Sequence, residues 1–383
     1  MRILQIVTLI SNTGAFGGPT TVAMNQCEAL RERGHDTLLV GGAHGFPAGP
    51  TSLRGTPVRL FQTRRFGRPN TMTYLASPTM LRWLDQHVAD FDVVHIHLAR
   101  DGITLPAAAL ARRRNIPYVL QTHGMVVPKE SPLHKIVDSV ATIRVLRDAH
   151  SLFALSNEEQ HILTALVGSD RRIDVLPNGI PEAAAHVGRA GASNREFLFL
   201  ARLHPRKRAV DFARAAVQLL SAGAEATFTL VGPDEGEGPA VTSIISGFAE
   251  RHPDAADALQ WVGPVAPDKS AAKLADAYVY VLPSVNEPFP MSLIEAMAEG
   301  RPVIVTESNG LADVVKDYDC GIVIPNESTE ALADAMRRLL AAPELAEQMG
   351  KRSLDAVRQR FSMNHVAETL EHNYRSTIHT SDH

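Results

Sequence analysis

Several features are scarce in this chain of 383 residues, and each scarcity argues against a class of protein. There are only two cysteines, Cys27 and Cys320, far apart and without the spacing of metal ligands, so neither a disulfide framework nor a zinc site is expected. No apolar run approaches the roughly 18 residues that a membrane-spanning helix needs. Lys and Arg number 38 against 42 Asp and Glu, and the net charge of −4 argues against a dedicated nucleic-acid-binding protein.

The start of the chain also lacks the cleavage site of a signal peptide. Residues 1–7 have the apolar pattern of a strand that leads into a glycine-rich turn. Together with the two inert thiols, this start predicts a cytoplasmic protein in a reducing compartment. The chain is longer than one ordinary core supports, so two domains are expected.

What the sequence does have is a regular alternation of strand-like and helix-like runs, which is typical of βαβ units around parallel strands. In the first half the strands are predicted at 3–9, 37–41, 93–97, 118–121 and 151–154, and the helices at 20–33, 79–87, 105–114 and 131–148. After residue 195 the pattern restarts, with strands at 197–201, 227–231, 260–262, 279–282, 302–305 and 321–324, and helices at 209–222, 240–251, 269–274, 292–298 and 329–340.

The predicted fold class is therefore α/β, with two Rossmann-like doubly wound domains that face each other across a cleft. Residues 180–194 are rich in Ala and Gly and have no strong period, so they are predicted to be the linker. We expect an N-terminal domain at 1–180, a second domain at 195–360 and a C-terminal helix at 361–383.

A glycine-rich turn that contains Gly17 and Gly18 follows the first strand and leads into a helix. Such a turn suits an anion or a closely approaching ligand, and the structural alternative is a turn that needs positive φ. The turn is not G-x-G-x-x-G, and the second strand ends in Gly41-Gly42, where a dinucleotide site would have Asp or Glu. A dehydrogenase is therefore disfavoured.

Basic residues follow the first strand of the second half, where Arg202 and Lys207 stand five positions apart. Arg offers bidentate hydrogen bonds and Lys a point charge, so the two could clamp a diphosphate. The alternative is a solvated basic loop. The diphosphate interpretation is favoured because ligands of doubly wound sheets bind at the carboxyl ends of the strands.

Two carboxylates follow the strand at 279–282, with Glu287 in a loop and Glu295 in the first turn of the next helix. Carboxylates at this end of a strand can hold sugar hydroxyl groups. However, Ser292-x-x-Glu295 also fits a capping box, in which Glu295 would only cap its helix. The pair could also be the acid and nucleophile of a glycosidase, but a hydrolase needs no diphosphate clamp.

These motifs, in this order, resemble those of the retaining glycosyltransferases of family 4, which have the GT-B fold. The resemblance covers nearly the whole chain. It consists of the glycine turn at 17–18, DVVHIH at 92–97, THG at 122–124, LS with EE within 155–159, LPNGI at 176–180, RLHPRK at 202–207, LVG at 230–232, VG at 262–263 and the paired glutamates.

The resemblance implies that the N-terminal domain binds the acceptor, that the second domain binds the sugar nucleotide, and that the C-terminal helix crosses back to the first domain. Arg202 and Lys207 would hold the diphosphate, and Glu295 would hold the ribose hydroxyls. Glu287 would hold the donor sugar and phosphate. His123 would lie on the acceptor side, close to the donor sugar, and would share the catalytic role with Arg202, Lys207 and Glu287.

Further donor contacts are implied at the ends of other strands. The backbone of Phe289, Pro290 and Met291 would assist Glu287, and the backbone at 262–263, which is Val262 and Gly263, would meet the base. The turn at 17–18 would lie over a phosphate or the acceptor. His95 and His97 alternate on one strand and point to one face, so structural roles are predicted for them.

The chain departs from the family pattern at three positions. Ala201 and Arg208 stand where family members commonly have glycine, and Pro290, next to Phe289, has no backbone N–H to offer a donor. The donor base and sugar are therefore not specified by the motifs, and a UDP- or GDP-sugar is expected. The family implies attack on the same face as the leaving group, with the leaving phosphate taking the acceptor proton.

No metal and no cofactor are expected, because the Asp-x-Asp strings at 90–92 and 317–319 lie at the wrong end of a strand and in a polar turn. The acceptor would be a sugar or a lipid-linked molecule. A basic cluster in the first half is either a solvated face or a peripheral contact with an anionic membrane at its inner face; its members are Arg54, Arg59, Arg64, Arg65 and Arg68. Two alternatives stay open: a non-catalytic sugar-nucleotide-binding protein and a GT-B-type sugar-nucleotide epimerase.

Overall fold

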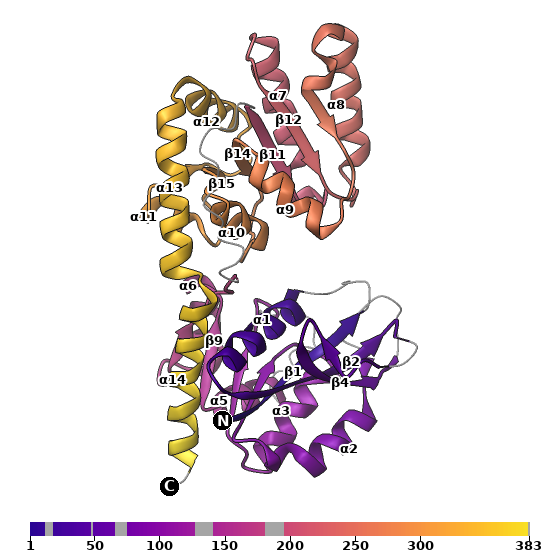
Figure 1. Cartoon of the computed structure of the whole chain (residues 1–383), viewed down its shortest axis with the longest axis vertical. Helices are drawn as coiled ribbons and strands as arrows, with labels where there is room; N and C mark the ends of the chain where they lie inside the picture. Colours follow the sequence, from indigo (N-terminus) through magenta and orange to yellow (C-terminus); the bar gives the residue numbers. More distant parts are fainter. Residues whose placement is uncertain (12–17, 47–48, 66–74, 127–140, 181–194, 382–383) are drawn as a thin grey trace. The chain divides into compact units, whose positions relative to one another are not determined.

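The computed structural model describes residues 1–383 except 12–17, 47–48, 66–74, 127–140, 181–194 and 382–383 (Figure 1). The chain divides into two compact units. Unit 1 consists of Met1–Gly179 with Met363–His383, and unit 2 of Ile180–Ser362. The helix α14 (Met363–Ser381) at the C-terminus thus belongs to unit 1, and nearly all of the predicted linker lies outside the described residues.

Unit 1 contains an eight-stranded sheet in the order β10-β9-β8-β7-β1-β2-β4-β3, and its strands are parallel except for the β3–β4 pair. The strands are β1 (Arg2–Ser11), β2 (Asp36–His44), β3 (Ser52–Leu53), β4 (Thr56–Gln62), β7 (Val93–His97), β8 (Tyr118–Gln121), β9 (Ser151–Ala154) and β10 (Ile173–Val175), and a small ribbon pairs β5 (Arg64–Arg65) with β6 (Leu75–Ala76). All five predicted strands are present. The unpredicted ones are two or three residues long, except β4, which has seven residues and lies between β2 and β3.

Helices cover both faces of this sheet, which explains why β1 is buried from Ile3 to Ile10. On one face Ile3, Val93 and Val119 form a core with side chains of α1 (Gly18–Glu32) and α14. On the other face Leu4, Val94 and Leu120 pack with helices that were predicted in part. These helices are α2 (Pro78–His87), α3 (Thr104–Arg113), α5 (Ile143–Asp148) and α6 (Asn157–Val167), and the short η2 (Val88–Asp90) follows α2. The part of the predicted helix 131–148 before residue 141 lies outside the described residues.

Unit 2 contains an all-parallel six-stranded sheet in the order β13-β12-β11-β14-β15-β16. The strands are β11 (Glu196–Leu200), β12 (Thr227–Val231), β13 (Leu259–Trp261), β14 (Val279–Leu282), β15 (Val303–Thr306) and β16 (Gly321–Ile324). The helices are η5 (Pro205–Lys207), α7 (Ala209–Ser221), α8 (Gly238–Arg251), η6 (Pro253–Ala258), α9 (Pro267–Asp276), α10 (Met291–Ala298), α11 (Ala312–Asp317), α12 (Thr329–Ala341) and α13 (Pro343–Arg360). All six strands match the predicted ones within a residue, whereas α11 and α13 were not predicted.

In each sheet the first strand along the chain lies in the interior, the next strands lie on one side of it, and the later strands lie on the other side. In unit 1, β1 lies between β2 and β7, and in unit 2, β11 lies between β12 and β14. This is the strand order of doubly wound folds, in which ligands bind beyond the carboxyl ends of the two strands where the direction of winding reverses. The predicted fold class of two Rossmann-like α/β domains is therefore confirmed, and each unit has one such switch point.

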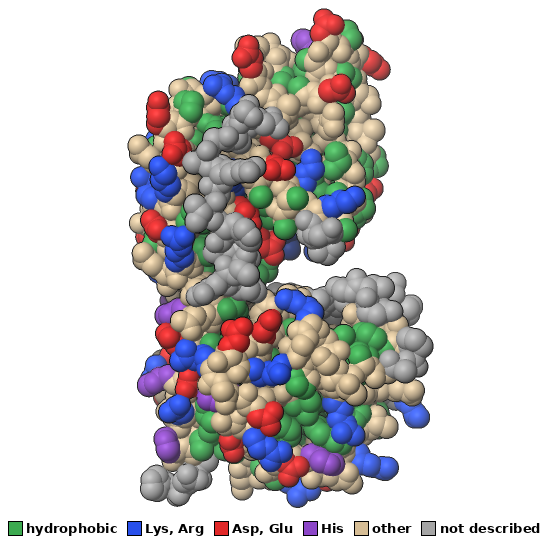
Figure 2. Space-filling view, viewed as in Figure 1, with side chains coloured by type: hydrophobic (Ala, Val, Ile, Leu, Met, Phe, Trp, Pro, Cys, Tyr) green, Lys and Arg blue, Asp and Glu red, His purple; other side chains and the backbone are tan. Residues whose placement is uncertain are grey.

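Charged side chains of both signs are interspersed on the face shown in Figure 2. Four members of the predicted basic cluster are described and exposed, namely Arg54, Arg59, Arg64 and Arg65, while Arg68 lies outside the described residues. Arg59 is not simply solvated, because its guanidinium lies 4.9 Å from the ring centre of Trp83. Within the described part of the chain, no helix is long and apolar enough to cross a membrane.

Candidate functional site

Two loops meet at the switch point of unit 2. Residues 201–208 follow β11, and residues 283–290 follow β14. The backbone N–H of Val285 donates to the carbonyl of Arg206 at 2.9 Å, and the guanidinium of Arg206 donates to the carbonyl of Asn286 at 3.0 Å. The basic loop and the glutamate loop, predicted separately from the sequence, are thus hydrogen-bonded to each other.

The central contact between these loops is an ion pair of Lys207 with Glu287. The Lys207 Nζ lies 2.6 Å from Glu287 Oε2, and the side chains are only 12% and 10% exposed. Arg206 approaches the same oxygen at 3.3 Å. Burial lowers the pKa of the Lys207 ammonium, and the nearby carboxylate of Glu287 opposes that shift. An ammonium has three hydrogens to donate, so Lys207 can bind a phosphate oxygen while it keeps Glu287.

Arg202, the other predicted half of the diphosphate clamp, has a different partner. Its Nη1 donates to both carboxylate oxygens of Glu235, each at 2.8 Å, from the loop after β12. The Arg202 side chain is 55% exposed. Exposed pairs of this kind are worth about 0–1 kcal/mol, so Arg202 can leave Glu235 for a phosphate at little cost.

The loop that carries Glu287 is anchored by the loop after β15. Asn286 has positive φ (50°), and its N–H donates to Ser308 Oγ at 2.9 Å. The N–H of Gly310 donates to the carbonyl of Glu287 at 2.7 Å. A Cβ at Gly310 would stand 1.9 Å from the carbonyl oxygen of Pro288, so only glycine permits this close approach. Sequence reasoning missed this support, for which the dipeptide Asn309-Gly310 was the available indication.

Glu295 does not cap its helix. The helix α10 begins at Met291 after Pro290, no side chain caps it, and the Ser292 hydroxyl hydrogen-bonds the Tyr280 hydroxyl at 2.7 Å. The capping-box alternative for Ser292 and Glu295 is therefore wrong. The carboxylate of Glu295 has no hydrogen bond to any other described residue. The side chain is exposed to solvent, but the protein around it displaces part of its hydration shell, and this desolvation raises its pKa.

The two helices that begin at this switch point differ at their N-termini. The N-terminus of α7 is closed, because Glu237 Oε2 accepts from the N–H of Ala209 at 2.7 Å. Burial raises the pKa of Glu237, and the N–H groups of Ala209 and Val210 oppose that shift. The N-terminus of α10 has no such carboxylate. Because a helix N-terminus attracts anions, α10 rather than α7 is the one available to a phosphate.

The remaining predicted donor contacts lie nearby in the fold. Phe289 is buried and packs edge-on against Phe361 at 6.1 Å between ring centres, so only its backbone can meet a ligand. At the end of β13, Val262 is 43% exposed and Gly263 has positive φ (74°). Gly263 is fixed by its carbonyl, which accepts from the N–H of Gly232 at 2.9 Å. Val262 therefore offers an apolar surface next to a fixed backbone.

In unit 1, His123 lies in a tight turn after β8. The N–H of Met125 donates to the carbonyl of Thr122 at 2.8 Å, and both central residues have positive φ, His123 at 50° and Gly124 at 71°. This combination is typical of a type I′ turn. His123 Nε2 lies 2.6 Å from His97 Nδ1, and the two rings stack. Burial lowers the pKa of His123 to about 3, so the ring is neutral at pH 7.

Glu159 anchors the turn at His123 by hydrogen bonds to its carboxylate. Its carboxylate accepts from the hydroxyl of Thr122 at 2.5 Å, from the N–H of Leu155 at 2.7 Å and from the N–H of Gly124. The predicted cap of α6 is confirmed, because Ser156 Oγ accepts from the N–H of Glu159 at 3.2 Å. The sequence indicated only that Glu159 begins a helix, and nothing in the motif marked it as a support for His123.

The glycine turn after β1 is described only in part. Gly17 lies outside the described residues, and Gly18 opens α1. Gly18 does not have positive φ, and a Cβ there would meet no atom within 4 Å. For Gly18, the structural alternative of a turn that requires positive φ is therefore wrong, and the fold itself does not demand glycine.

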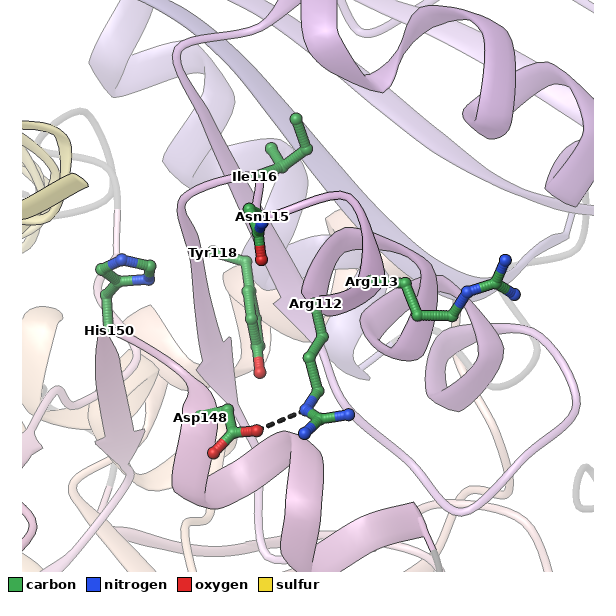
Figure 3. Close-up of a pocket in the computed structure, with 7 residues that line it drawn as sticks. All are labelled: Arg112, Arg113, Asn115, Ile116, Tyr118, Asp148 and His150. Carbon is green, nitrogen blue, oxygen red and sulfur yellow. Dashed lines mark hydrogen bonds and ion pairs between the residues drawn. The ribbon is translucent and has the colours of Figure 1, made fainter. Parts of the chain in front are cut away.

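A pocket of about 530 Å³ lies in unit 1 away from these residues (Figure 3). It is at the amino ends of β8 and β9, the sheet edge opposite the carboxyl ends where His123 stands. Arg112 forms an ion pair with Asp148 there, and Tyr118 donates to the carbonyl of Val145 at 2.8 Å. No predicted site residue lines this pocket.

Comparison with known proteins places this geometry in a family. A model of glycosyl transferases group 1 matches residues 194–342, and a model of the glycosyl transferase 4-like domain matches residues 17–179. The chain belongs to the glycosyltransferases of family 4 and has the GT-B fold.

Relatives and solved structures agree with this assignment. The chain is 27% identical over 313 residues to the D-inositol 3-phosphate glycosyltransferase of Nocardia farcinica, covering 75% of this chain and 67% of that protein. It is 26% identical over 364 residues to the protein of that name from Nocardiopsis dassonvillei, covering 86% and 83%. The fold resembles sucrose-phosphate synthase from Thermosynechococcus elongatus, with a TM-score of 0.76, 20% identity and coverage of 99% and 100%. It also resembles Anabaena HepE in complex with UDP, with a TM-score of 0.74, 16% identity and coverage of 98% and 100%. The two actinobacterial relatives are named as glycosyltransferases, which argues against the epimerase alternative, and the two solved structures support the fold.

At Arg208 the resemblance implied a glycine, and the structure shows the conformation of the arginine that stands there. Arg208 has φ of 61° and ψ of 41°, the left-handed conformation that favours glycine. Its guanidinium Nε pairs with Asp211 at 2.6 Å and its Nη1 with Glu327 at 3.6 Å. The arginine thus forms ion pairs at a position where its backbone is strained.

The two Asp-x-Asp strings of the glycosyltransferase have structural partners. Asp92 Oδ2 accepts from the N–H of Arg2 at 2.7 Å, at the amino ends of β1 and β7. Asp319 pairs with Arg352 at 2.9 Å. Among the described residues there is no group of three or more His, Cys, Asp or Glu side chains that could hold a metal ion.

Proposed function

We propose that this glycosyltransferase moves a sugar from a UDP- or GDP-sugar to a sugar or lipid-linked acceptor, with retention of configuration and without a metal ion. In this proposal unit 2 binds the donor and unit 1 binds the acceptor. The observation that carries it is the switch point of unit 2, where Lys207, Glu287 and Glu295 accompany the uncapped N-terminus of α10.

The charges at that switch point suit a nucleoside diphosphate. Lys207 and the N-terminus of α10 provide positive potential for the phosphates, and Arg202 can join them because its pair with Glu235 is exposed. Glu237 occupies the N-terminus of α7 and thereby directs the anion to α10. These groups would stabilise the charge that develops on the departing diphosphate, which is the largest electrostatic requirement of the reaction.

The carboxylates would serve the hydroxyl groups of the donor. Glu295 has no partner among the described residues, so its oxygens are available to two adjacent hydroxyls of a ribose. Glu287 is held in place by Lys207 and would bind the donor sugar. Val262 and the backbone of Gly263 would meet the base, with the exposed apolar side chain of Val262 against its face.

The donor and acceptor are proposed from the relatives. Anabaena HepE has been solved with UDP, and TarM of Staphylococcus aureus with UDP, which supports a uridine nucleotide. The relatives named D-inositol 3-phosphate glycosyltransferase make a polyol phosphate the first acceptor to test. A contact of unit 1 with an anionic membrane stays a proposal for lipid-linked acceptors only.

The chemistry would proceed without a covalent intermediate on the protein. The ion pair keeps Glu287 close to Lys207, and in that role it positions the donor rather than attacks it. The acceptor hydroxyl would attack the face from which the diphosphate leaves, and the departing phosphate oxygen would take its proton.

The test is a donor screen followed by a transfer assay. UDP-, GDP- and ADP-sugars are compared by thermal shift, because a ligand that binds only the native state raises its stability. Release of nucleoside diphosphate is then measured without acceptor and with D-inositol 3-phosphate, with and without EDTA, and the anomeric proton of the product is read by NMR. A stable donor complex that never releases diphosphate with any acceptor would favour the non-catalytic binding protein. An inverted anomeric centre would refute retention, and activity lost to EDTA and restored by manganese would refute metal independence.

A further inference from the structure

A row of polar side chains lies inside unit 1, on the sheet face covered by α1 and α14. Gln5, His95, His97 and Gln121 occupy that face of β1, β7 and β8, and each has 0% exposure. Burial of a polar side chain is costly unless it is hydrogen-bonded. Apolar side chains would fill this face of the sheet at lower cost, so the four buried polar side chains indicate a role other than packing.

The orientation of the Gln5 amide sets the direction of the hydrogen bonds in this row. Its Oε1 lies 3.0 Å from His97 Nε2, while its own Nε2 has no hydrogen-bond partner among the described residues. Because an amide oxygen only accepts, Nε2 of His97 carries the hydrogen in this orientation. Burial and the neighbouring His95 and His123 lower the pKa of His97 well below its ordinary value, so the ring is neutral and its Nδ1 has no hydrogen. His97 Nδ1 must then accept from His123 Nε2, 2.6 Å away.

The same reasoning fixes the state of His123. Its ring is neutral and its single hydrogen is on Nε2, so Nδ1 has a free lone pair. His123 is only half-buried, and Nδ1 has no hydrogen bond to another described residue. The ring is held by the strained turn, by Glu159 beneath that turn and by stacking on His97 at 4.9 Å between ring centres.

His95, at the end of the row away from His123, is held by the C-terminal helix α14. His95 Nδ1 lies 2.6 Å from the hydroxyl of Tyr374 on α14, and the rings of His95 and His97 stack at 4.6 Å. Burial lowers the pKa of His95 to about 3, so the histidine that supports His97 is also neutral. No charge therefore competes with the direction set by Gln5.

We propose that Gln5 and His97 are positioning residues that hold His123 as its neutral Nε2–H tautomer, so that Nδ1 presents a hydrogen-bond acceptor to a hydroxyl group of a bound sugar. The identity of the ligand rests on the proposed function, whereas the tautomer does not. Nδ1 of His123 then favours a sugar whose hydroxyl group donates a hydrogen bond to it. A sugar with fluorine in place of that hydroxyl cannot donate, so it should bind or react less well.

The direct test is ¹⁵N NMR of the full chain labelled at histidine, between pH 6 and pH 8 and without ligand. The ring signals of His123 are assigned by their loss in His123→Asn. We expect protonated Nε2 and unprotonated Nδ1 in the wild type. Gln5→Met, of similar size but without an acceptor, should give a mixture of tautomers. A charged ring, or an Nδ1–H tautomer in the wild type, would overturn the proposal even if Gln5→Met fails to fold.

A second test uses transfer once the donor is known. Gln5→Met should lower kcat by about tenfold, the equivalent of one 1.4 kcal/mol hydrogen-bond preference, and leave the Kd of the nucleoside diphosphate unchanged. Among deoxyfluoro analogues of the donor and acceptor sugars, one should be a poor substrate for the wild type and be less penalised in Gln5→Met. Equal penalties for every analogue in both proteins would overturn the role in selection. Absence of transfer with every donor would instead contradict the proposed function and leave the tautomer to the NMR result.

Discussion

Replacement of Lys207 by methionine is expected to have two effects that can be separated. The substitution keeps the length of the side chain and removes its charge. It leaves the carboxylate of Glu287, only 10% exposed, with Arg206 at 3.3 Å as its remaining ion-pair partner. It also removes the ammonium proposed to hold the diphosphate.

The first effect is on the stability of unit 2. Removal of one partner from a buried ion pair costs about 3–5 kcal/mol, and because Arg206 retains part of the pairing we expect about 2–3 kcal/mol for Lys207→Met. The second effect is on affinity for UDP or GDP. Loss of one hydrogen bond to a charged group costs about 1.5–3 kcal/mol, which weakens binding by roughly 10- to 100-fold.

The double variant Lys207→Met with Glu287→Gln distinguishes the two effects. It removes the stranded charge, so most of the lost stability should return, while the affinity for the nucleotide should stay low. Unit 2 contains Trp261 and unit 1 contains Trp83, the only two tryptophans of the chain. In a Trp83→Phe background, urea unfolding followed by fluorescence therefore reports on unit 2, and calorimetry of the same proteins gives the Kd.

The reasoning would be refuted in either of two ways. If Lys207→Met binds the nucleoside diphosphate as tightly as the wild type, Lys207 is not a phosphate ligand. If the double variant recovers the affinity together with the stability, the loss of binding in the single variant was a consequence of unfolding.

Three further outcomes are expected. Glu287→Ala should chiefly slow transfer, so unchanged rates would remove the role assigned to that carboxylate. Arg208→Gly should be about 1 kcal/mol more stable to urea than Arg208→Ala, because both lose the ion pairs and only glycine relieves the left-handed backbone; equal stabilities would contradict this. Burial lowers the pKa of His95 and His123 from 6.5 to about 3, so below pH 6.5 the unfolded state binds more protons than the folded state. The free energy of unfolding should therefore be highest above pH 6.5 and fall as the pH drops below that value. The fully buried His95 should contribute a loss of about 2 kcal/mol between pH 8 and pH 5, and the half-buried His123 a smaller one because solvent screens it; His95→Phe should reduce the total loss by about 2 kcal/mol.

The sequence predicted the sheets better than the contacts that complete the site. Buried parallel strands such as β14 are continuous apolar runs between turns, and their bounds are therefore visible in the sequence. The helices α11 and α13 were missed. The helix α11 is only six residues long, and α13 follows α12 after a single residue, Ala342.

The pairing of the site residues was not visible in the sequence. Lys207 and Glu287 are 80 positions apart, and only the order of the strands brings β11 next to β14. The role of Glu237 at the N-terminus of α7 likewise depends on a tertiary contact across 28 positions. The apparent capping box at Ser292 does not form, because the Ser292 hydroxyl hydrogen-bonds the hydroxyl of Tyr280 on β14 instead.

The measurement that tests the central claim most directly is calorimetric titration of UDP, GDP and ADP into the wild type, Glu295→Ala and Glu250→Ala. Glu250 is an exposed acid on α8 and serves as the matched control. We predict that UDP or GDP binds the wild type and Glu250→Ala alike, and that Glu295→Ala binds it at least tenfold more weakly, the equivalent of about 1.4 kcal/mol. If none of the three nucleotides binds, or if Glu295→Ala binds with unchanged affinity, the proposed donor site in unit 2 is wrong.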